Sequence, residues 1–265
     1  MLTSSRSRLT RVIFFRKHKM LFFKHWGVIA LIALFASSPS FAQKITVATE
    51  EYPPYNFLDS SKKISGMSTE VVEEVLKRAK LEYHLDIYPW ARAYKMAQEA
   101  PNVLIYSIGR SEKRESLFKW VDVIAPWDVY LYRLKSRPEI KVDKLDDIKK
   151  YKIGAVRDDV RAQYLEKLGV KPDLTNSDSF NSKKLAVNRI DMFPIDEAAL
   201  IALYKREGVD PEIVVKVFKL ADLSTGLYMA FSHETSDDIV HKCKVALAEM
   251  KKDGTFEKIR MKYLK

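Results

Sequence analysis

Apolar positions along the chain change their spacing in a regular order, which predicts strands and helices in alternation. The run KITVATE at 44–50 predicts a strand, and the segment 68–81 after it places its apolar residues on one helical face. The same order then repeats, with strands predicted at 83–89 and 102–108 and helices predicted at 91–100 and 111–118. A repeated strand-helix order predicts a parallel sheet covered by helices.

A second series of elements follows a polar passage. Residues 127–136 lead into the charged, proline-marked stretch 137–150, which we interpret as a crossing between two domains. Beyond it, strands are predicted at 151–156, 190–195, 212–220 and 226–234, and helices at 160–169, 179–189, 196–208 and 236–265, the last broken at Gly254.

The number of predicted strands sets the domain organisation. Too few strands precede residue 130 or follow residue 226 to form two separate domains. We therefore expect the tail to return to the first domain, so that 43–130 and 226–265 form one lobe and 131–225 forms the other. Two crossings then make a two-stranded hinge, with a ligand cleft at the carboxyl ends of the strands.

The N-terminal segment has the features of an export signal. The uncharged apolar run WGVIALIALFA at 26–36 is shorter than the ~20 residues that span a bilayer. Ser40 and Ala42 follow it at the small-residue positions of a signal-peptidase site. We predict a signal peptide at 1–42 and a periplasmic, monomeric mature protein that begins at Gln43. A start at Met20 and an uncleaved N-terminal membrane anchor are the alternatives.

Charge and cysteine content exclude several classes of function. Residues 1–42 hold seven of the 46 Lys and Arg and none of the 35 acidic residues, so the remainder carries +4 rather than +11. This charge is spread along the chain and does not favour a nucleic-acid partner. The single cysteine, Cys243, allows no intramolecular disulfide and lies on the apolar face of a predicted helix. No His or Cys spacing predicts a metal site, and we expect no cofactor.

Several segments together resemble the periplasmic solute-binding proteins of ABC transporters, in the branch for polar amino acids. They are ITVATEEYPPYNF, the helix after ISGM, SEKRESLFKWV, YKIGAV, RIDMFPIDE and ALAEMKKDGTFEKIRMKYL, and their order covers essentially the whole chain after residue 42. The resemblance implies an α/β, two-lobed type II periplasmic-binding-protein fold. Its two parallel-type sheets would carry helices on both faces.

The resemblance also implies a carboxylate clamp in YSIGRSEKR. Arg114 stands at the arginine position of the clamp and Ser107 at the serine that precedes it. A guanidinium donates two N–H groups to one carboxylate, and the start of a helix capped by Ser111 would add positive potential. The alternative is that Arg114 pairs with a glutamate of its own solvated helix. Arg110 is either a surface residue or a contact to a second anionic group.

The remaining ligand contacts are implied on both lobes. Asp196 ends the strand IDMFPI at the position that holds a ligand ammonium, whereas Asp191 in the same segment is better explained as structural. Tyr52 matches the aromatic residue that covers the ligand side chain, and Trp90 follows the second strand at the edge of the cleft. Either aromatic residue could instead belong to the core.

One turn departs from the family pattern. Where the amino-acid binders carry a small Gly-Thr turn, this chain has the charged sequence RDDVR at 157–161. If Arg157 or Arg161 reaches the cleft, a ligand with a second acidic group is favoured. If Asp158 or Asp159 does, a basic or polyamine-like group is favoured. Arg157 and Asp159 are therefore included among the candidate ligand-binding residues.

Two classes of function remain. The first is a binding protein that captures a small polar or zwitterionic solute by hinge closure and delivers it to an ABC permease or to a membrane sensor. The second is an enzyme on the same scaffold, similar to cyclohexadienyl dehydratase, in which a carboxyl group transfers a proton. Only Glu50, Glu51, Asp158 and Asp159 are candidates for that group, and none lies in a recognised catalytic motif.

The signal peptide predicts where the exported chain begins. N-terminal sequencing of the exported protein should start at Gln43, because the small residues before it satisfy signal peptidase. An exported chain that retains residues 20–42 would show an uncleaved anchor instead.

Overall fold

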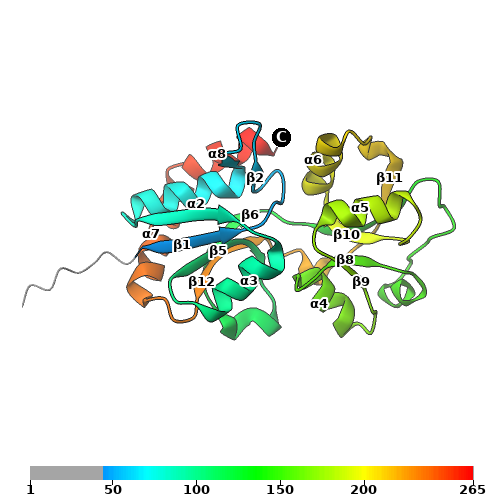
Figure 1. Ribbon diagram of the computed structural model, residues 1–265, viewed down its shortest axis with the longest axis horizontal. Coiled ribbons are helices and arrows are strands. Elements are labelled where there is room, and N and C mark those ends of the chain that lie inside the picture. The colour runs from blue at the N-terminus through cyan, green and yellow to red at the C-terminus, as the bar shows by residue number, and fades with distance from the viewer. Residues whose placement is uncertain (1–43, 265) are drawn as a thin grey trace, which may run out of the picture. The chain divides into compact units, whose positions relative to one another are not determined.

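The computed structural model describes residues 44–264 (Figure 1). The predicted signal peptide and the mature N-terminus at Gln43 lie outside these residues. Within them, no helix has both the length and the apolar character that crossing a membrane requires.

The elements alternate much as the hydrophobic pattern predicted, but the strands at 118–125, 129–134 and 173–175 are among those that it did not predict. The strands are β1 (Ile45–Thr49), β2 (Phe57–Leu58), β3 (Ile64–Ser65), β4 (Tyr83–Ile87), β5 (Val103–Gly109), β6 (Phe118–Ala125), β7 (Val129–Leu134), β8 (Gly154–Val156), β9 (Asp173–Thr175), β10 (Phe193–Asp196), β11 (Val214–Lys219) and β12 (Leu227–Ser232). The α-helices are α2 (Met67–Arg78), α3 (Trp90–Glu99), α4 (Val160–Lys167), α5 (Asp178–Ala186), α6 (Glu197–Glu207), α7 (Asp237–Lys252) and α8 (Thr255–Tyr263). Short 3₁₀ helices are η1 (Glu112–Leu117), η2 (Leu145–Lys150), η3 (Pro211–Ile213) and η4 (Ala221–Leu223).

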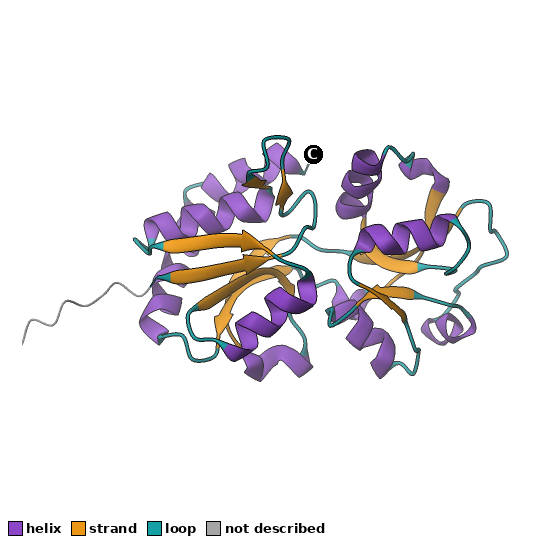
Figure 2. Ribbon diagram, in the orientation of Figure 1, coloured by secondary structure: helices purple, strands orange, loops and turns teal. Residues whose placement is uncertain are grey.

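The first sheet has five strands in the order β4-β1-β5-β12-β6, and we call the residues of this sheet and its helices the first part. Helices α2, α7 and α8 cover one face and α3 covers the other (Figure 2). Side chains alternate between these faces along β1: Ile45 and Val47 pack with α2 and α7, whereas Ala48 packs with α3. Both faces are therefore buried.

The second sheet has three strands in the order β10-β7-β11, and residues 129–219 around it form the second part. The parallel pair β8 and β9 lies beside it, joined through a bridge between Ile153 and Met192. The core of the second part also takes in Tyr52 and Tyr55, which come from the loop after β1. The two parts thus share buried side chains.

Each sheet differs from the expected parallel arrangement in one strand. β12 runs antiparallel to its neighbours β5 and β6, and β7 runs antiparallel to β10 and β11. The reason is connectivity: β6 leads out of the first part and β12 leads back into it from the same end, so the two must run in opposite directions. β7 and β11 have the same relation in the second part.

The connections between the sheets are shorter than predicted. Residues 126–128 link β6 to β7, and residues 220–226 link β11 to β12. The prediction that 137–150 forms a crossing is wrong, because β7 has already joined the second sheet at 129–134. Strand membership agrees with a tail that returns to the first part, while the exact division into lobes stays a prediction.

Strand β5 contains an irregularity that affects the residues after it. Ser107 has a φ of 55°, and the pairing with β12 shifts register between Tyr228 and Met229, opposite this residue. Such a bulge reverses the side-chain alternation. As a result Ile108 faces α3 together with Ile105, although the strict alternation would have placed it on the other face.

The C-terminal helices agree with their predicted pattern. Cys243 is fully buried on α7 with Leu247 and Met250, which confirms the core assignment of this thiol. Burial raises the pKa of Cys243 to about 12, so the side chain stays protonated and inert at neutral pH. The predicted break at Gly254 separates α7 from α8.

Gly66 packs against the backbone of Tyr55 so closely that no side chain fits at this position. Its φ is 124°, and a Cβ built there would lie 2.3 Å from the carbonyl oxygen of Tyr55. Gly66→Ala should therefore lower the free energy of unfolding by at least about 2 kcal/mol. Gly254→Ala is the matched control, because Gly254 has a φ of 82° but no atom within 4 Å of the added Cβ. Urea unfolding that gives equal losses for both variants would contradict the clash.

Candidate ligand-binding site between the two sheets

Arg114 lies in η1 and is fully buried at 0% exposure. Its Nη1 donates to the carbonyl of Gly109 at 2.9 Å, and its Nη2 reaches the second part, donating to the carbonyl of Asp158 at 2.8 Å. The guanidinium stands 4.7 Å from the ring centre of Tyr94 and 5.5 Å from that of Trp90. Arg114 is thus an internal cation held by carbonyls and aromatic faces, and the alternative of a solvated surface pair is wrong.

Several buried donors in this region have no hydrogen-bond partner within residues 44–264, and three of them concern the site. They are Arg114 Nε, Trp90 Nε1 and Ser107 Oγ. Trp90 is 2% exposed, and the guanidinium of Arg114 lies over the face of its ring. Ser107 combines its unpartnered hydroxyl with the strained φ of the bulge. Unsatisfied buried donors are costly, and a cluster of them indicates a place for an acceptor.

Asp196 ends β10 and serves as the N-cap of α6, where its Oδ1 accepts from the backbone N–H of Ala199 at 3.0 Å. The hydroxyl of Tyr52 donates to Oδ2 at 2.5 Å, and that of Tyr55 donates to Oδ1 at 2.8 Å. Burial raises the pKa of Asp196, although these hydrogen bonds act in the opposite direction. Both tyrosines come from the loop after β1, so Asp196 of the second part accepts hydrogen bonds from residues that follow a strand of the first part.

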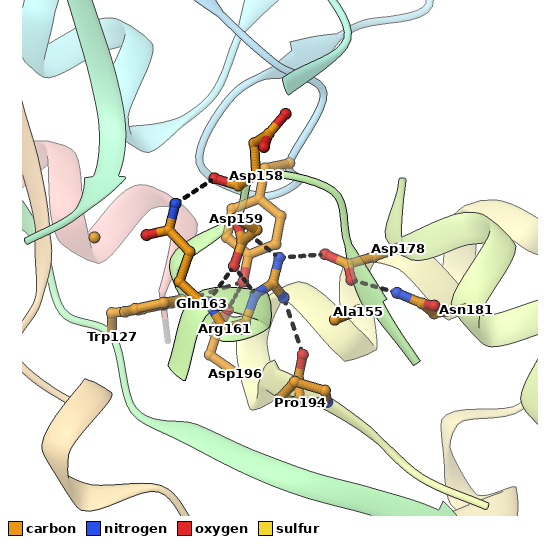
Figure 3. A network of polar contacts seen from close by, with 12 residues as sticks. Trp127, Ala155, Asp158, Asp159, Arg161, Gln163, Asp178, Asn181, Pro194 and Asp196 are labelled. Atoms are coloured by element: carbon orange, nitrogen blue, oxygen red, sulfur yellow. Dashed lines mark hydrogen bonds and ion pairs between the residues drawn. The ribbon is translucent and has the colours of Figure 1, made fainter. Parts of the chain in front are cut away.

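The charged turn forms a buried network around Arg161 (Figure 3). Arg161 is 2% exposed; its Nε donates to Asp159 at 2.8 Å, its Nη2 to Asp178 at 3.0 Å and its Nη1 to the carbonyl of Pro194 at 3.0 Å. Burial alone would raise the pKa of Asp159, but the charge of Arg161 holds it below the usual value. Burial raises the pKa of Asp178 despite the same arginine.

The other residues of the turn are placed differently. Arg157 is exposed, and no hydrogen bond or ion pair joins its side chain to the rest of residues 44–264. Asp158 is also exposed, with a φ of 59°, and takes part in the site only through its carbonyl, which accepts from Arg114. The buried charged residues of the turn are therefore Asp159 and Arg161, and their charges compensate each other.

Glu50 is a part of this site that the sequence interpretation considered only as a catalytic candidate. Its carboxylate is partly buried and accepts no hydrogen bond from the described residues. Burial raises the pKa of Glu50 well above its ordinary value, and the neighbouring Asp159 and Asp178 raise it further. Arg161 and Arg114 act in the opposite direction without cancelling the effect. Glu50 therefore adds a further carboxylate to an already charged interior.

The two parts approach each other closely beside Arg114. A Cβ built on Gly109 would lie 2.7 Å from Val160 Cγ1 of α4 and 3.1 Å from the ring of Trp127. Only glycine at position 109 permits this approach, because any side chain would separate the parts. At the opposite edge, Glu51 pairs with Arg206 of α6 at 2.8 Å.

A cavity of about 220 Å³ opens beside Tyr52 and Asp178. Its apolar wall includes Ile195 and Leu203, and its polar wall is formed by the first turn of α5 and the end of α6. The other lining residues are Glu51, Pro53, Ser177, Ser179, Ala199, Arg206 and Glu207. Because Tyr52 also binds Asp196, and Asp178 also binds Arg161, the cavity adjoins the charged network.

The structure brings most of the predicted site residues to one interface but arranges them differently from the expectation. Arg114 and Asp196 are not hydrogen-bonded to each other. Arg114 interacts with the charge of Asp159, Asp159 pairs with Arg161, and Arg161 interacts with the charge of Asp196. The sequence left the role of Arg110 open between a surface residue and a contact to a second anionic group; in the structure Arg110 pairs with Glu115 of η1.

Two further site residues, Tyr55 and Asp178, were missed. The second tyrosine of YPPY could have suggested Tyr55, since it follows Tyr52 by three positions. Asp178 gave no comparable signal, because an acidic residue in the first turn of a predicted helix is common on protein surfaces.

A sequence profile described as bacterial extracellular solute-binding proteins, family 3, matches residues 45–265, and the chain belongs to this family. It is a solute-binding protein. Among curated relatives, the L-cystine-binding protein TcyJ of Escherichia coli (strain K12) is 23% identical over 217 residues, covering 80% of this chain and 79% of that protein.

Solved structures share the fold of the chain. An ancestral arginine-binding protein bound to arginine has a TM-score of 0.72 at 23% identity, covering 84% of this chain and 98% of that one. A histidine kinase sensor domain with similarity to periplasmic binding proteins has a TM-score of 0.74 at 20% identity, covering 84% of this chain and 96% of that domain. The fold is that of the type II periplasmic binding proteins.

The raised pKa of Glu50 predicts how stability depends on pH in the absence of ligand. A carboxyl whose folded pKa exceeds its unfolded value of about 4.3 destabilises the protein above the folded pKa, and the penalty disappears as pH falls toward 4.3. Glu50→Gln should therefore be more stable than the wild type at pH 7.5, by about 1 kcal/mol or more. The advantage should shrink at pH 5.

Thermal unfolding of both proteins across this pH range measures the difference. Glu212→Gln is the control, since Glu212 is an exposed carboxylate that pairs with Lys135 outside the site. An advantage of Glu50→Gln that does not change with pH would show that the charge of Glu50 is not its cause.

Proposed function

We propose that the protein captures a small amino-acid-like solute between its two parts and delivers it to the membrane permease of an ABC transporter. The observation that carries the proposal is the fully buried Arg114, which keeps one unpartnered donor at an interface bounded on the other side by the carboxylate of Asp196. A ligand with a carboxylate and an amine would find an opposite charge at each end of this interface.

The carboxylate end of the ligand is assigned to Arg114. Its Nε is free to donate, and Ser107 Oγ and Trp90 Nε1 supply further unpartnered donors. A carboxylate accepts several hydrogen bonds and would relieve the cost of burying these groups. The strained backbone of Ser107 supports a functional role for this bulge.

The amine end is assigned to Asp196 and Glu50. Two tyrosine hydroxyls and one backbone N–H occupy three of the roughly four acceptor positions on the Asp196 carboxylate, which leaves room for one ammonium N–H. Glu50 accepts no hydrogen bond from the described residues and supplies a second carboxylate. Tyr52 would lie between the two ends, with its ring against Arg161 at 5.5 Å.

Capture would proceed by a hinge movement about the two connections, 126–128 and 220–226. The contacts from Arg114 to Asp158 and from Tyr52 to Asp196 join the two parts and would be broken and remade as the solute enters. No chemical step is needed, so we assign a binding role and not catalysis. A membrane sensor is the alternative recipient, and a periplasmic monomer is the proposed form.

Substitution of Arg114 tests the carboxylate end. Arg114→Met should weaken binding of the solute by roughly 30-fold to several thousand-fold, because a buried ligand charge would lose its partner at a cost of about 2 to 5 kcal/mol. Arg114→Lys should recover only part of the affinity, since it keeps the charge but loses the planar fork. Calorimetric titration with a panel of amino acids and cystine measures these affinities.

Arg110→Met is the matched control, because Arg110 lies four residues away on the same segment and pairs with Glu115. It should leave the affinity within about twofold of the wild type. An Arg114→Met protein that melts cooperatively and binds as tightly as the wild type would refute the assignment of the clamp.

A further inference from the structure

We infer that the site selects a solute of net positive charge, an amino acid whose side chain ends in an amine or guanidinium, and that the cavity beside Tyr52 receives this second cationic group. The inference rests on the proposed function and adds the charge class of the solute. It is drawn from the balance of buried charges and from the position of the cavity.

The described residues of the site hold more carboxyl groups than guanidiniums. Glu50, Asp159 and Asp178 lie near one another, and Asp196 lies near Arg161. Among the described residues, the guanidiniums of Arg114 and Arg161 are the two cations that these four carboxyl groups face. A neutral zwitterion would leave the excess unchanged. A solute with one more positive charge would reduce it, and buried charges require such compensation.

Arg114 identifies the end at which the solute carboxylate belongs. Its guanidinium is fully buried, it lies among these carboxylates, and its Nε lacks a partner within the described residues. A solute without any carboxylate would leave this donor unsatisfied. The site therefore favours a solute with one carboxylate and two cationic groups over a simple diamine.

The cavity places the second cationic group. Its walls carry the carboxylates of Glu51, Asp178 and Glu207 against the single guanidinium of Arg206. Asp178 belongs both to this wall and to the ion pair with Arg161, so the cavity continues from the charged network. Ile195 and Leu203 provide an apolar wall suited to the methylene groups of a long side chain.

Glu207 is the carboxylate of the cavity wall whose charge can be removed to test the inference. It accepts hydrogen bonds from the hydroxyls of Ser179 and Ser182 and forms no ion pair within the described residues. Glu207→Gln keeps an acceptor for these serines and removes the charge. Glu212→Gln, outside the cavity, is the matched control.

The experiment compares arginine with citrulline, which has the same length but an uncharged ureido group, by calorimetric titration of the purified protein. We expect arginine to bind at least tenfold more tightly than citrulline. Glu207→Gln should reduce this ratio toward one by weakening arginine alone, and Glu212→Gln should not change it. If Glu207→Gln does not melt cooperatively, the ratio of the two affinities in the wild-type protein still tests the inference, because that comparison needs no variant.

The outcomes separate this inference from the proposed function. Equal affinities for arginine and citrulline, or tighter binding of glutamine or cystine, would overturn the inference and leave the proposed function standing. Equal weakening of arginine and citrulline by Glu207→Gln would show that the cavity does not recognise charge. Failure of every amino acid in the panel to bind would overturn both proposals.

Discussion

The guanidinium of Arg161 organises the interface on which the rest of this site depends. It joins the N-cap of α4 through Asp159, the first turn of α5 through Asp178 and the end of β10 through the carbonyl of Pro194. Three elements of the second part are thereby held around one buried cation. Removing one charged partner of such a network would leave the other charges unpaired in the interior. The conformation of the turn at 157–161 is therefore strongly constrained.

Polar contacts extend from this network across the interface. The ring of Tyr52 lies against Arg161 while its hydroxyl binds Asp196, and Arg114 reaches from the first part to the carbonyl of Asp158. The same groups that join the two parts are also those that a solute would contact. In the proposed function, binding and movement of the parts would therefore be coupled, since a solute that competes for these groups would change the contacts between the parts.

Burial of several carboxylates in one interior also determines how the site responds to its surroundings. Desolvation raises the pKa values of Glu50, Asp178 and Asp196, whereas Arg161 holds the pKa of Asp159 below its ordinary value. Protonation at low pH would relieve this burial cost, and a bound cation would offset it at neutral pH. Asp159 and Arg161 come from the charged turn at 157–161, whereas Glu50 follows β1, Asp178 begins α5 and Asp196 ends β10.

The sequence alone determined most of the order of elements, though not strands β6, β7 and β9, because hydrophobic spacing and strand ends are local properties of the chain. It also determined the core position of Cys243 and the resemblance that placed Arg114 and Asp196 in one site. It did not determine the reversed strands β7 and β12, the short connections at 126–128 and 220–226, or which charges of the turn are buried. Those features depend on contacts between residues far apart in sequence. Asp178 and Arg161 show the difference: each looks like a solvated helix residue until the tertiary structure brings them within 3.0 Å of each other and removes both from water.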